Sequence, residues 1–562
     1  MNGFSRRHFL SGAVSLAALA VMRPALAQPA PGKPRFAANP FLFGVASGDP
    51  LPDSVVLWTR LGLDLADPES WGLSEAAYRV VWSLHDAQKP SGAPIASGET
   101  VAAREKGYAV HVEVGGLEPG RRYRFSFRCG DEASAEGLTK TAPTAESAQP
   151  LRFGFCSCSE YENHYFHAYR AMAEEDFDFA VHLGDYIYEL PYEHFRNRFN
   201  RPTIRRLKFD RYDAEGKPIY LKTLGEFRRR YAEYRMDPDL QEAHRVMPWI
   251  VTWDDHEVEN DYAGSSPVDQ PQEGFAEKRI NAYRAYFENM PIRLSALPEV
   301  NGLRQLYRRF DFGRLLRLHV LDERQYRDVQ ACRAPFGQRK TIHIVPKDCP
   351  ELGLDDQRQM LGEAQFAWLA EGLETSPARW NVLAQGVPFS PAMREGKDGG
   401  PATIWHDSWA GYPWAQANVM ELMARQAQKN PVIISGDIHS HWVNCVRRFK
   451  ADPVFKLALP SIEDAANDAR FAAIAPEFVC TSISSNLRDF TEDYQLARVP
   501  HLVKYHDGNH HGYVAVEATG EAFTATMVRM MADAQDPSAR PAFDRSERYG
   551  VTPGQPEPRR IA

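Results

Sequence analysis

The sequence lacks any long apolar run beyond about its first thirty residues, so no stable membrane span is expected once that leader is removed. It also lacks an excess of basic residues, because 66 Lys and Arg stand against 74 Asp and Glu, a net charge of −8. Nucleic acids and anionic membranes both reward a basic face, so we expect neither as the main partner and no nucleic-acid-binding module. With 43% hydrophobic residues, the chain of 562 residues has ample material for a large core.

Cysteine is scarce. Seven cysteines are few for a secreted disulfide scaffold of this size, and the odd number leaves at least one thiol unpaired. Cys332 and Cys349 flank a loop-like stretch that contains proline and could form one bridge. Cys156 and Cys158 directly follow a predicted buried strand, where a thiol can serve chemistry rather than packing.

Residues 1–27 have the pattern of an export signal. Ser5-Arg6-Arg7-His8-Phe9-Leu10 precedes a short, mildly apolar run, and Ala25-Leu26-Ala27 offers small residues for cleavage. The adjacent arginines followed by Phe-Leu resemble a twin-arginine (Tat) signal, which predicts the Tat export machinery as a partner and a periplasmic or secreted location. An ordinary Sec signal with two neighbouring arginines is the alternative.

The rest of the chain divides into two regions of different pattern. Residues 40–141 consist of short alternating strands with turn residues between them, which predicts a β-sandwich, and Leu117-Glu118-Pro119-Gly120 before Tyr123 resembles a fibronectin-III-like corner. After a small, polar linker, residues 150–525 alternate buried strands with amphipathic helices, the α/β pattern of a layered sheet with helices outside. Residues 531–562 are rich in Pro, Arg, Asp and Ser and are expected to form a loosely ordered tail.

Four buried strands of the α/β region are each followed directly by side chains that can bind metal. The clusters are Cys156-Ser157-Cys158 after 151–155, Gly184-Asp185-Tyr186-Ile187-Tyr188-Glu189 after 177–183, Asp254-Asp255-His256-Glu257-Val258-Glu259-Asn260-Asp261 after 246–253, and Gly436-Asp437-Ile438-His439-Ser440-His441 after 432–435. Ligand sites in α/β sheets form beyond the carboxyl ends of the strands. One Gly-Asp cluster is ordinary turn chemistry, but four in one domain indicate a metal site.

The residue types indicate which metals this site would take. Hard divalent cations such as calcium or manganese suit the oxygen donors Asp185, Asp255, Asp437 and Asn260. The phenolate, thiolate and imidazole of Tyr188, Cys158 and His439 favour Fe(III) over zinc. Taken singly, Tyr188 could be a core aromatic residue and Cys158 an inert thiol. If Asp185 bridges the two environments, the site holds two or more metals, which is the arrangement that hydrolyses phosphate esters with metal-activated water.

The motifs also resemble those of a known family. Phe155-Cys156-Ser157-Cys158, GDYIYE at 184–189, WDDHEVEND at 253–261, LDERQYR at 321–327 and SGDIHS at 435–440 are similar to PhoD-type alkaline phosphatases. The segment FGVASGDPLPDSVVLWTRL at 43–61 resembles the N-terminal domain of that family. The resemblance implies a layered metallophosphoesterase-like β-sandwich flanked by helices and preceded by the all-β fibronectin-III-like domain. It also implies Fe(III) plus Ca²⁺ and hydrolysis of phosphate monoesters or diesters.

Carried over residue by residue, the resemblance gives each position a role. Iron would be held by Cys158, Asp185, Tyr188 and His439. Calcium would be held by Asp185, Asn260 and Asp437, with Asp255 as a further carboxylate in or near the coordination shell. His256 would stand near the phosphate or leaving group. Cys156 departs from the family pattern, which has a small residue at that position, so both cysteines are candidate ligands; strand parity and the motif alignment favour Cys158.

Arg324, just after the strand at 315–322, is the best candidate for a bidentate contact to a phosphate oxygen, the alternative being an ion pair with Asp322 or Glu323. The sequence thus predicts a periplasmic or secreted phosphatase acting on phosphate esters. A phosphodiesterase or phospholipase D-like hydrolase is the alternative within the same chemistry. A periplasmic phosphate- or metal-binding protein is the alternative from another class.

Overall fold

The computed structural model describes residues 33–561 apart from 90–91, 191–218, 269–271, 301–302, 334–342, 354–356, 391–392, 395–402, 449, 453–455, 459–460, 489–498 and 533–535. The predicted export signal, residues 1–27, lies outside the described residues. No helix in the described ranges is both long enough and apolar enough to cross a bilayer.

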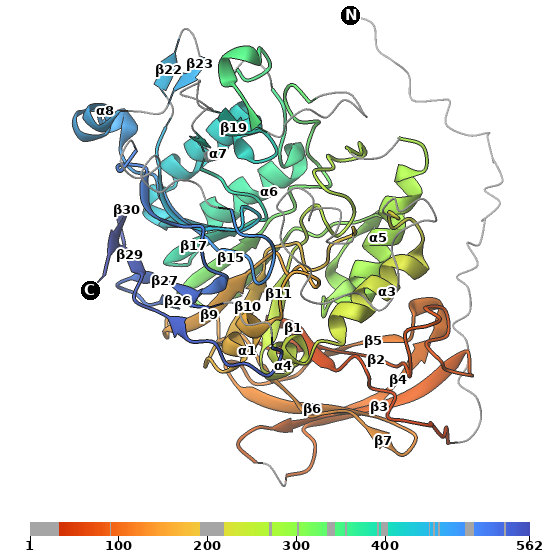
Figure 1. The fold of residues 1–562 in the computed structure, drawn as a ribbon. Coiled ribbons are helices and arrows are strands. Elements are labelled where there is room, and N and C mark those ends of the chain that lie inside the picture. Colours follow the sequence, from red (N-terminus) through yellow and green to blue (C-terminus); the bar gives the residue numbers. More distant parts are fainter. Residues whose placement is uncertain are drawn as a thin grey trace, which may run out of the picture.

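Two large sheets form the centre of the molecule (Figure 1). The first has the order β30-β29-β27-β26-β9-β10-β11-β1-β2-β5, with β28 beside β27. Its strands are β1 (Val45–Leu51), β2 (Ser54–Arg60), β5 (Ala109–Val114), β9 (Leu151–Cys156), β10 (Phe179–His182), β11 (Pro248–Val251), β26 (Gly512–Ala518), β27 (Phe523–Met530), β28 (Phe543–Asp544), β29 (Arg548–Thr552) and β30 (Gln555–Arg560).

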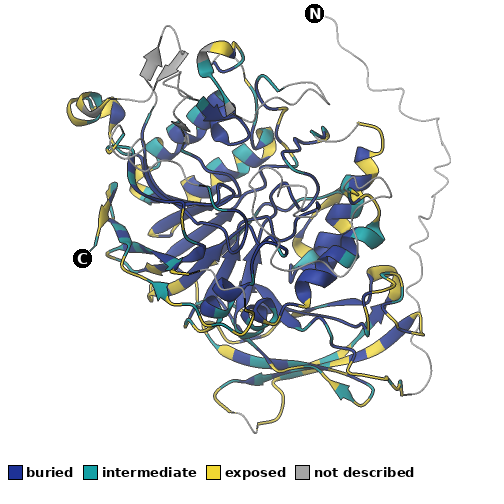
Figure 2. Ribbon diagram, viewed as in Figure 1, coloured by how far each residue is buried: buried dark blue, intermediate teal, exposed yellow. Residues whose placement is uncertain are grey.

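The second sheet has the order β14-β15-β17-β20-β24-β21-β25. Its strands are β14 (Arg308–Phe312), β15 (Leu316–Val320), β17 (Trp380–Ala384), β20 (Pro431–Ser435), β24 (Ala475–Val479), β21 (His441–Val446) and β25 (Val503–Asp507). The two sheets pack face to face, and alternate apolar residues such as Phe155 and Val181 of the first meet Leu318 and Ile434 of the second. This core is fully buried (Figure 2).

Helices cover the outer faces of both central sheets. The first sheet is covered by α1 (His167–Ala173), α3 (Leu224–Arg235), α4 (Pro238–Val246) and α5 (Phe275–Asn289), and the second by α6 (Gly362–Thr375) and α7 (Pro413–Arg425). Sequence signals fix several of these helix starts. Thr223 and Glu226 form a capping box before α3, and Asp237 caps α4 with Pro238 at its first position. The mixed α/β layering predicted for residues 150–525 is therefore present.

The strands of the N-terminal region, predicted as a β-sandwich, belong to two different sheets. One of its sheets contains β3 (Ala77–Asp86), β4 (Ala96–Ala103), β6 (Arg122–Cys129), β7 (Glu132–Ala133) and β8 (Gly137–Lys140). Its other strands, β1, β2 and β5, continue the first central sheet, because β1 pairs in parallel with β11. The two regions thus share one sheet. The fibronectin-III-like character of this module stays a prediction.

The expectation of a loosely ordered tail at residues 531–562 is wrong for the part from Phe543 to Arg560, which contains three strands. Strands β29 and β30 form an antiparallel hairpin, and β29 pairs with β27 of the first central sheet. Tyr549 and Val551 reach the core of that sheet, and Glu557 forms ion pairs with Arg447 and Lys504. The polar composition of this segment reflects an edge hairpin with one exposed face.

The bridge considered between Cys332 and Cys349 is present as a disulfide. The other cysteines are buried free thiols: Cys129, Cys156, Cys158, Cys445 and Cys480.

Candidate metal centre

The predicted ligand-bearing loops meet at one edge of the two central sheets. Strands β9, β10 and β11 run parallel, and so do β15, β17, β20 and β24. Their carboxyl ends therefore lie at the same edge of each sheet. Because the sheets pack face to face, loops that are far apart in sequence converge there, as the sequence predicted.

Cys158, Asp185 and His439 place a ligand atom each within 4.8 Å of one another, and all three are buried. The Tyr188 hydroxyl joins them, 3.1 Å from Asp185 Oδ2 and 3.1 Å from His439 Nε2. His439 Nδ1 lies 2.7 Å from the Asn486 carbonyl, which requires Nδ1 to carry the proton and leaves Nε2 able to ligate a metal. Cys156 faces the helix layer instead, so Cys158 is the cysteine at the site.

A second cluster shares Asp185. Asp185, Asp254, Asp255 and Asp437 bring carboxylate oxygens within 4.8 Å of one another. One oxygen in each of three of these residues is buried without a hydrogen-bond partner: Asp185 Oδ1, Asp254 Oδ2 and Asp437 Oδ2. Asp254 was missed by the sequence analysis, although it stands inside the WDDHE motif. Its neighbour Asp255 was chosen instead.

Asn260 and His256 are both tied to Glu189, the last residue of the GDYIYE motif. The Asn260 backbone N–H donates to Glu189 Oε1 at 2.9 Å, and His256 Nδ1 lies 2.7 Å from Glu189 Oε2. The His256 ring packs on the Tyr188 ring with centroids 4.1 Å apart. Burial alone would lower the pKa of His256, but the surrounding carboxylates, with Glu189 foremost, raise it well above its usual value.

The backbone at this edge is strained. Cys158, Asp185, Asp437 and His439 all have positive φ, between 56° and 65°. Non-glycine residues avoid this left-handed region, which costs about 1–3 kcal/mol each and is tolerated mainly where function demands it. Glu257 helps to hold this geometry, because its carboxylate accepts the N–H groups of Asp185, Tyr186 and Asp254. At Gly184 a side chain would collide with Asp254, since a Cβ there would lie 2.4 Å from Asp254 Cβ.

Burial and mutual repulsion act on the acids of the cluster. Burial first, and then the negative charge of neighbouring acids, raises the pKa of Cys158, Asp185, Tyr188 and Asp437 well above the usual values. These groups can all be anionic only if a positive charge stands among them. For His439, burial and then the positive charge of Arg488 lower the pKa well below its usual value, so the imidazole is neutral and able to ligate.

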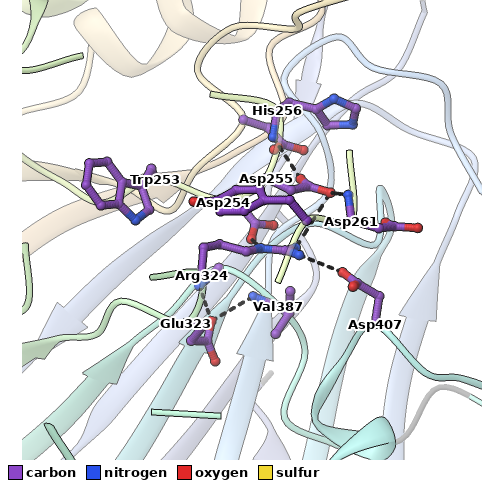
Figure 3. A network of polar contacts seen from close by, with 12 residues as sticks. Trp253, Asp254, Asp255, His256, Asp261, Glu323, Arg324, Val387 and Asp407 are labelled. Carbon is purple, nitrogen blue, oxygen red and sulfur yellow. Dashed lines mark hydrogen bonds and ion pairs between the residues drawn. The ribbon is translucent and has the colours of Figure 1, made fainter. Parts of the chain in front are cut away.

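Arg324 lies behind the cluster, fully buried in a network of carboxylates (Figure 3). Its Nε donates to Asp254 Oδ1, its Nη1 donates to Asp407 Oδ2 at 2.8 Å, and its Nη2 lies 3.7 Å from Asp255 Oδ2. The alternative considered from sequence, an ion pair with Asp322 or Glu323, is therefore wrong. A guanidinium already surrounded by three carboxylates is poorly placed to grip a substrate phosphate.

Asp407 is a residue that the sequence analysis missed. It accepts hydrogen bonds from Arg324, Arg327 and Gln330, and these contacts lower its pKa to about 2 although burial opposes the shift. No sequence signal marked it, because it follows β19 (Thr403–Trp405), a short strand of a small separate sheet, rather than a strand of the two central sheets.

The donor set fits a metal centre. Buried thiol, phenol, imidazole and carboxylate groups converge, several carboxylate oxygens have no hydrogen-bond partner, and the anionic forms need a cation. Together with the helix-flanked double sheet, these residues define a metal-dependent phosphoesterase.

Comparisons with known proteins support that class. The family model for the PhoD-like phosphatase matches residues 153–527, and that for the PhoD-like phosphatase N-terminal domain matches residues 25–143. Alkaline phosphatase D of Bacillus subtilis (strain 168) is 37% identical over 549 residues, which cover 96% of this chain and 86% of that protein. The chain belongs to the PhoD-like phosphatase family and is a phosphoric ester hydrolase.

Solved structures agree. A structure of PhoD superposes with a TM-score of 0.81 at 34% identity, covering 94% of this chain and 93% of that chain. A purple acid phosphatase from yellow lupin (Lupinus luteus) seeds has a TM-score of 0.53 at 12% identity, covering 90% of this chain and 74% of that chain. The second likeness concerns the fold alone.

Proposed function

We propose that this hydrolase is an Fe(III)- and Ca²⁺-dependent alkaline phosphatase that acts on phosphate monoesters. Iron would be held by Cys158, Asp185, Tyr188 and His439, because anionic sulfur and phenolate donors suit a high-valent iron. Calcium would be held by Asp185, Asp437 and Asn260, with Asp255 beside them. Asp254 has a free oxygen facing the same cluster and joins this set.

When bound, the metals supply Lewis acidity and a water whose pKa is lowered toward neutrality. The chain's own residues supply the rest. His256 is held by Glu189, and the surrounding carboxylates raise its pKa and so favour the imidazolium, which can donate a proton to the leaving oxygen. Arg324 is a positioning residue that fixes Asp254 and Asp255. We propose this role for it in place of the phosphate contact expected from sequence.

The observation that carries this proposal is the convergence of Cys158, Tyr188 and His439 around Asp185. A ferric phenolate absorbs visible light, so the purified holoenzyme should be coloured and contain both iron and calcium by elemental analysis. Tyr188→Phe should lose the visible band and most phosphatase activity, whereas Tyr326→Phe, at a partly exposed tyrosine, should keep both. A colourless, iron-free enzyme with full activity would refute the metal assignment.

The diesterase or phospholipase D-like alternative uses the same groups. Rates on p-nitrophenyl phosphate and bis(p-nitrophenyl) phosphate separate it from the monoesterase proposal, which requires the monoester to be the better substrate. The alternative of a protein that only binds phosphate or metal does not fit a member of a hydrolase family.

We also propose export through the Tat route to the periplasm or the medium, on the strength of Arg6-Arg7 in residues 1–27. Replacing both arginines by lysine should leave the enzyme inside the cell. Continued export of that variant would favour the Sec alternative.

A further inference from the structure

Phosphate esters bring negative charge into this acidic site, and the buried arginines behind it are already engaged. Arg324 is surrounded by Asp254, Asp255 and Asp407. Arg327 donates to the carboxylate of Asp407 at 2.6 Å and to the carbonyls of Asp407 and Tyr262 at 3.0 and 2.8 Å. Their charge is balanced within the protein, so an arginine that binds the substrate's phosphate group must be a different one.

The segment after β24 runs along the proposed iron ligands. Ser485 Oγ donates to the Tyr188 hydroxyl at 2.8 Å. The Asn486 carbonyl accepts the His439 Nδ1 proton, and the Arg488 backbone N–H donates to the His439 carbonyl at 3.3 Å. These contacts fix Arg488 next to His439, at the end of a segment that borders the site.

The Arg488 side chain differs from Arg324 in its surroundings. It is only partly buried, and in the described part of the chain its guanidinium has no carboxylate within ion-pair distance. It lies over the ring of Trp405, 5.3 Å from the centroid, and Trp405 is itself 2% exposed in the core. Stacking on an indole holds a guanidinium plane in place and leaves its N–H edge able to donate two parallel hydrogen bonds.

Trp405 also connects this arginine to the buried network. It precedes Asp407 by two residues, and Asp407 is anchored by Arg324 and Arg327. The Trp405 ring under Arg488 is therefore held by the same buried network that positions Asp254.

We propose that Arg488 binds the non-bridging oxygens of the substrate's phosphate group and makes the site prefer dianionic monoesters to monoanionic diesters. This inference rests on the proposed function. A monoester presents an additional negative charge and an additional free oxygen to a bidentate guanidinium, so it gains more from Arg488 than a diester does.

The test compares metal-loaded wild type with Arg488→Met and Arg488→Lys. For p-nitrophenyl phosphate, Arg488→Met should raise KM about 10- to 100-fold, the range expected for a lost charge-assisted hydrogen bond. The Ki of inorganic phosphate should rise by a similar factor, and the ratio of monoester to diester kcat/KM should fall about tenfold. Arg488→Lys keeps the charge without the bidentate geometry and should fall between the two.

Arg470→Met is the matched control, because Arg470 is exposed and pairs with Asp468 at the surface. Iron content and the visible band should be unchanged in all variants, which separates substrate binding from a structural effect. If Arg488→Met loses metal, the test uses Arg488→Lys instead, with its KM for p-nitrophenyl phosphate and its Ki for inorganic phosphate.

A KM and a Ki within twofold of wild type in metal-loaded Arg488 variants would overturn the inference. A wild-type holoenzyme that hydrolyses neither ester would instead overturn the proposed function.

Discussion

Two clusters of buried acids lie at this edge of the sheets. The negative charge of each cluster is compensated in a different way. The first contains Asp185, Asp437 and Cys158, whose pKa values are raised. The second contains Asp255, Asp261 and Asp407, whose carboxylates also come within 4.8 Å of one another. By distance alone, either could hold a cation.

The difference is the presence of arginine. Arg324 contacts Asp255 and Asp407, and its charge lowers the pKa of both carboxyl groups although burial opposes this. In the described part of the chain no arginine forms an ion pair with Asp185 or Asp437, and each of these two carboxylates keeps an oxygen without a hydrogen-bond partner. A buried acid cluster needs a counter-charge. In one cluster the chain provides it, and in the other it must come from bound metal.

The sharpest test of this comparison is Asp185→Asn, at the residue shared by both proposed metal positions. Iron and calcium content should fall together, and phosphatase activity should fall about 1,000-fold or more because metal-activated water is lost. Asp176→Asn, at an exposed residue paired with Arg122, is the control and should match wild type. Full metal content in Asp185→Asn would contradict the assignment of the first cluster.

His256→Asn should separate proton donation from metal binding. Because His256 contacts Glu189 and the Tyr188 ring, we expect kcat to fall about 100-fold with metal content retained. The loss should be smaller for esters with good leaving groups, such as p-nitrophenyl phosphate, than for alkyl phosphates. An equal loss for both substrates would argue against a role at the leaving group.

Asp407→Asn tests the arginine-balanced cluster. Removing one partner from a buried ion-pair network should lower the free energy of unfolding by about 3 kcal/mol, measured by thermal or urea denaturation. Asp311→Asn is the matched control, because Asp311 pairs with Arg317 at a more exposed position and should cost less than about 1 kcal/mol. Equal effects of the two substitutions would show that burial does not set the strength of this network.

A smaller effect on the free energy of unfolding is expected at Asp507, a carboxylate that is paired with Arg529 of the same chain. Burial would raise its pKa, but the Asn509 N–H and Arg529 lower it from 3.8 to about 2. The ionised carboxylate therefore stabilises the fold above about pH 4, by about 2 kcal/mol, and this contribution disappears as the pH falls toward 2.

Asp507→Asn should accordingly destabilise the protein at pH 7 and match wild type near pH 2 if both remain folded there. The check is the difference in free energy of unfolding across that pH range. A difference that stays constant with pH would contradict the ion-pair explanation.

Much of the architecture could be predicted because its signals are local. The strand predicted at 151–155 is present at Leu151–Cys156, because its aromatic and aliphatic residues are a local signal. The edge hairpin β29–β30 was not predicted, because its stability comes from pairing with β27 and from ion pairs to distant residues. Composition alone describes such a segment as loose.

The site, too, has some features that local sequence signals predict and others that depend on contacts between distant residues. Each metal-competent cluster follows a buried strand, so Cys158, Asp185 and His439 could be named before the fold was known. The partners of Arg324 could not. A phosphate contact was expected for Arg324, with the adjacent acids as the alternative, whereas its partners Asp254 and Asp407 lie 70 and 83 residues away in the chain.

The order of residues along the chain thus determined which donors would be available and on which strand ends they would stand, because hydrophobic periodicity and turn chemistry act over a few residues. Only the packing of one sheet against the other decided how charge is balanced among them. Electrostatic compensation acts through space in a medium of low polarity, so the residues that neutralise one another are those that the fold makes neighbours.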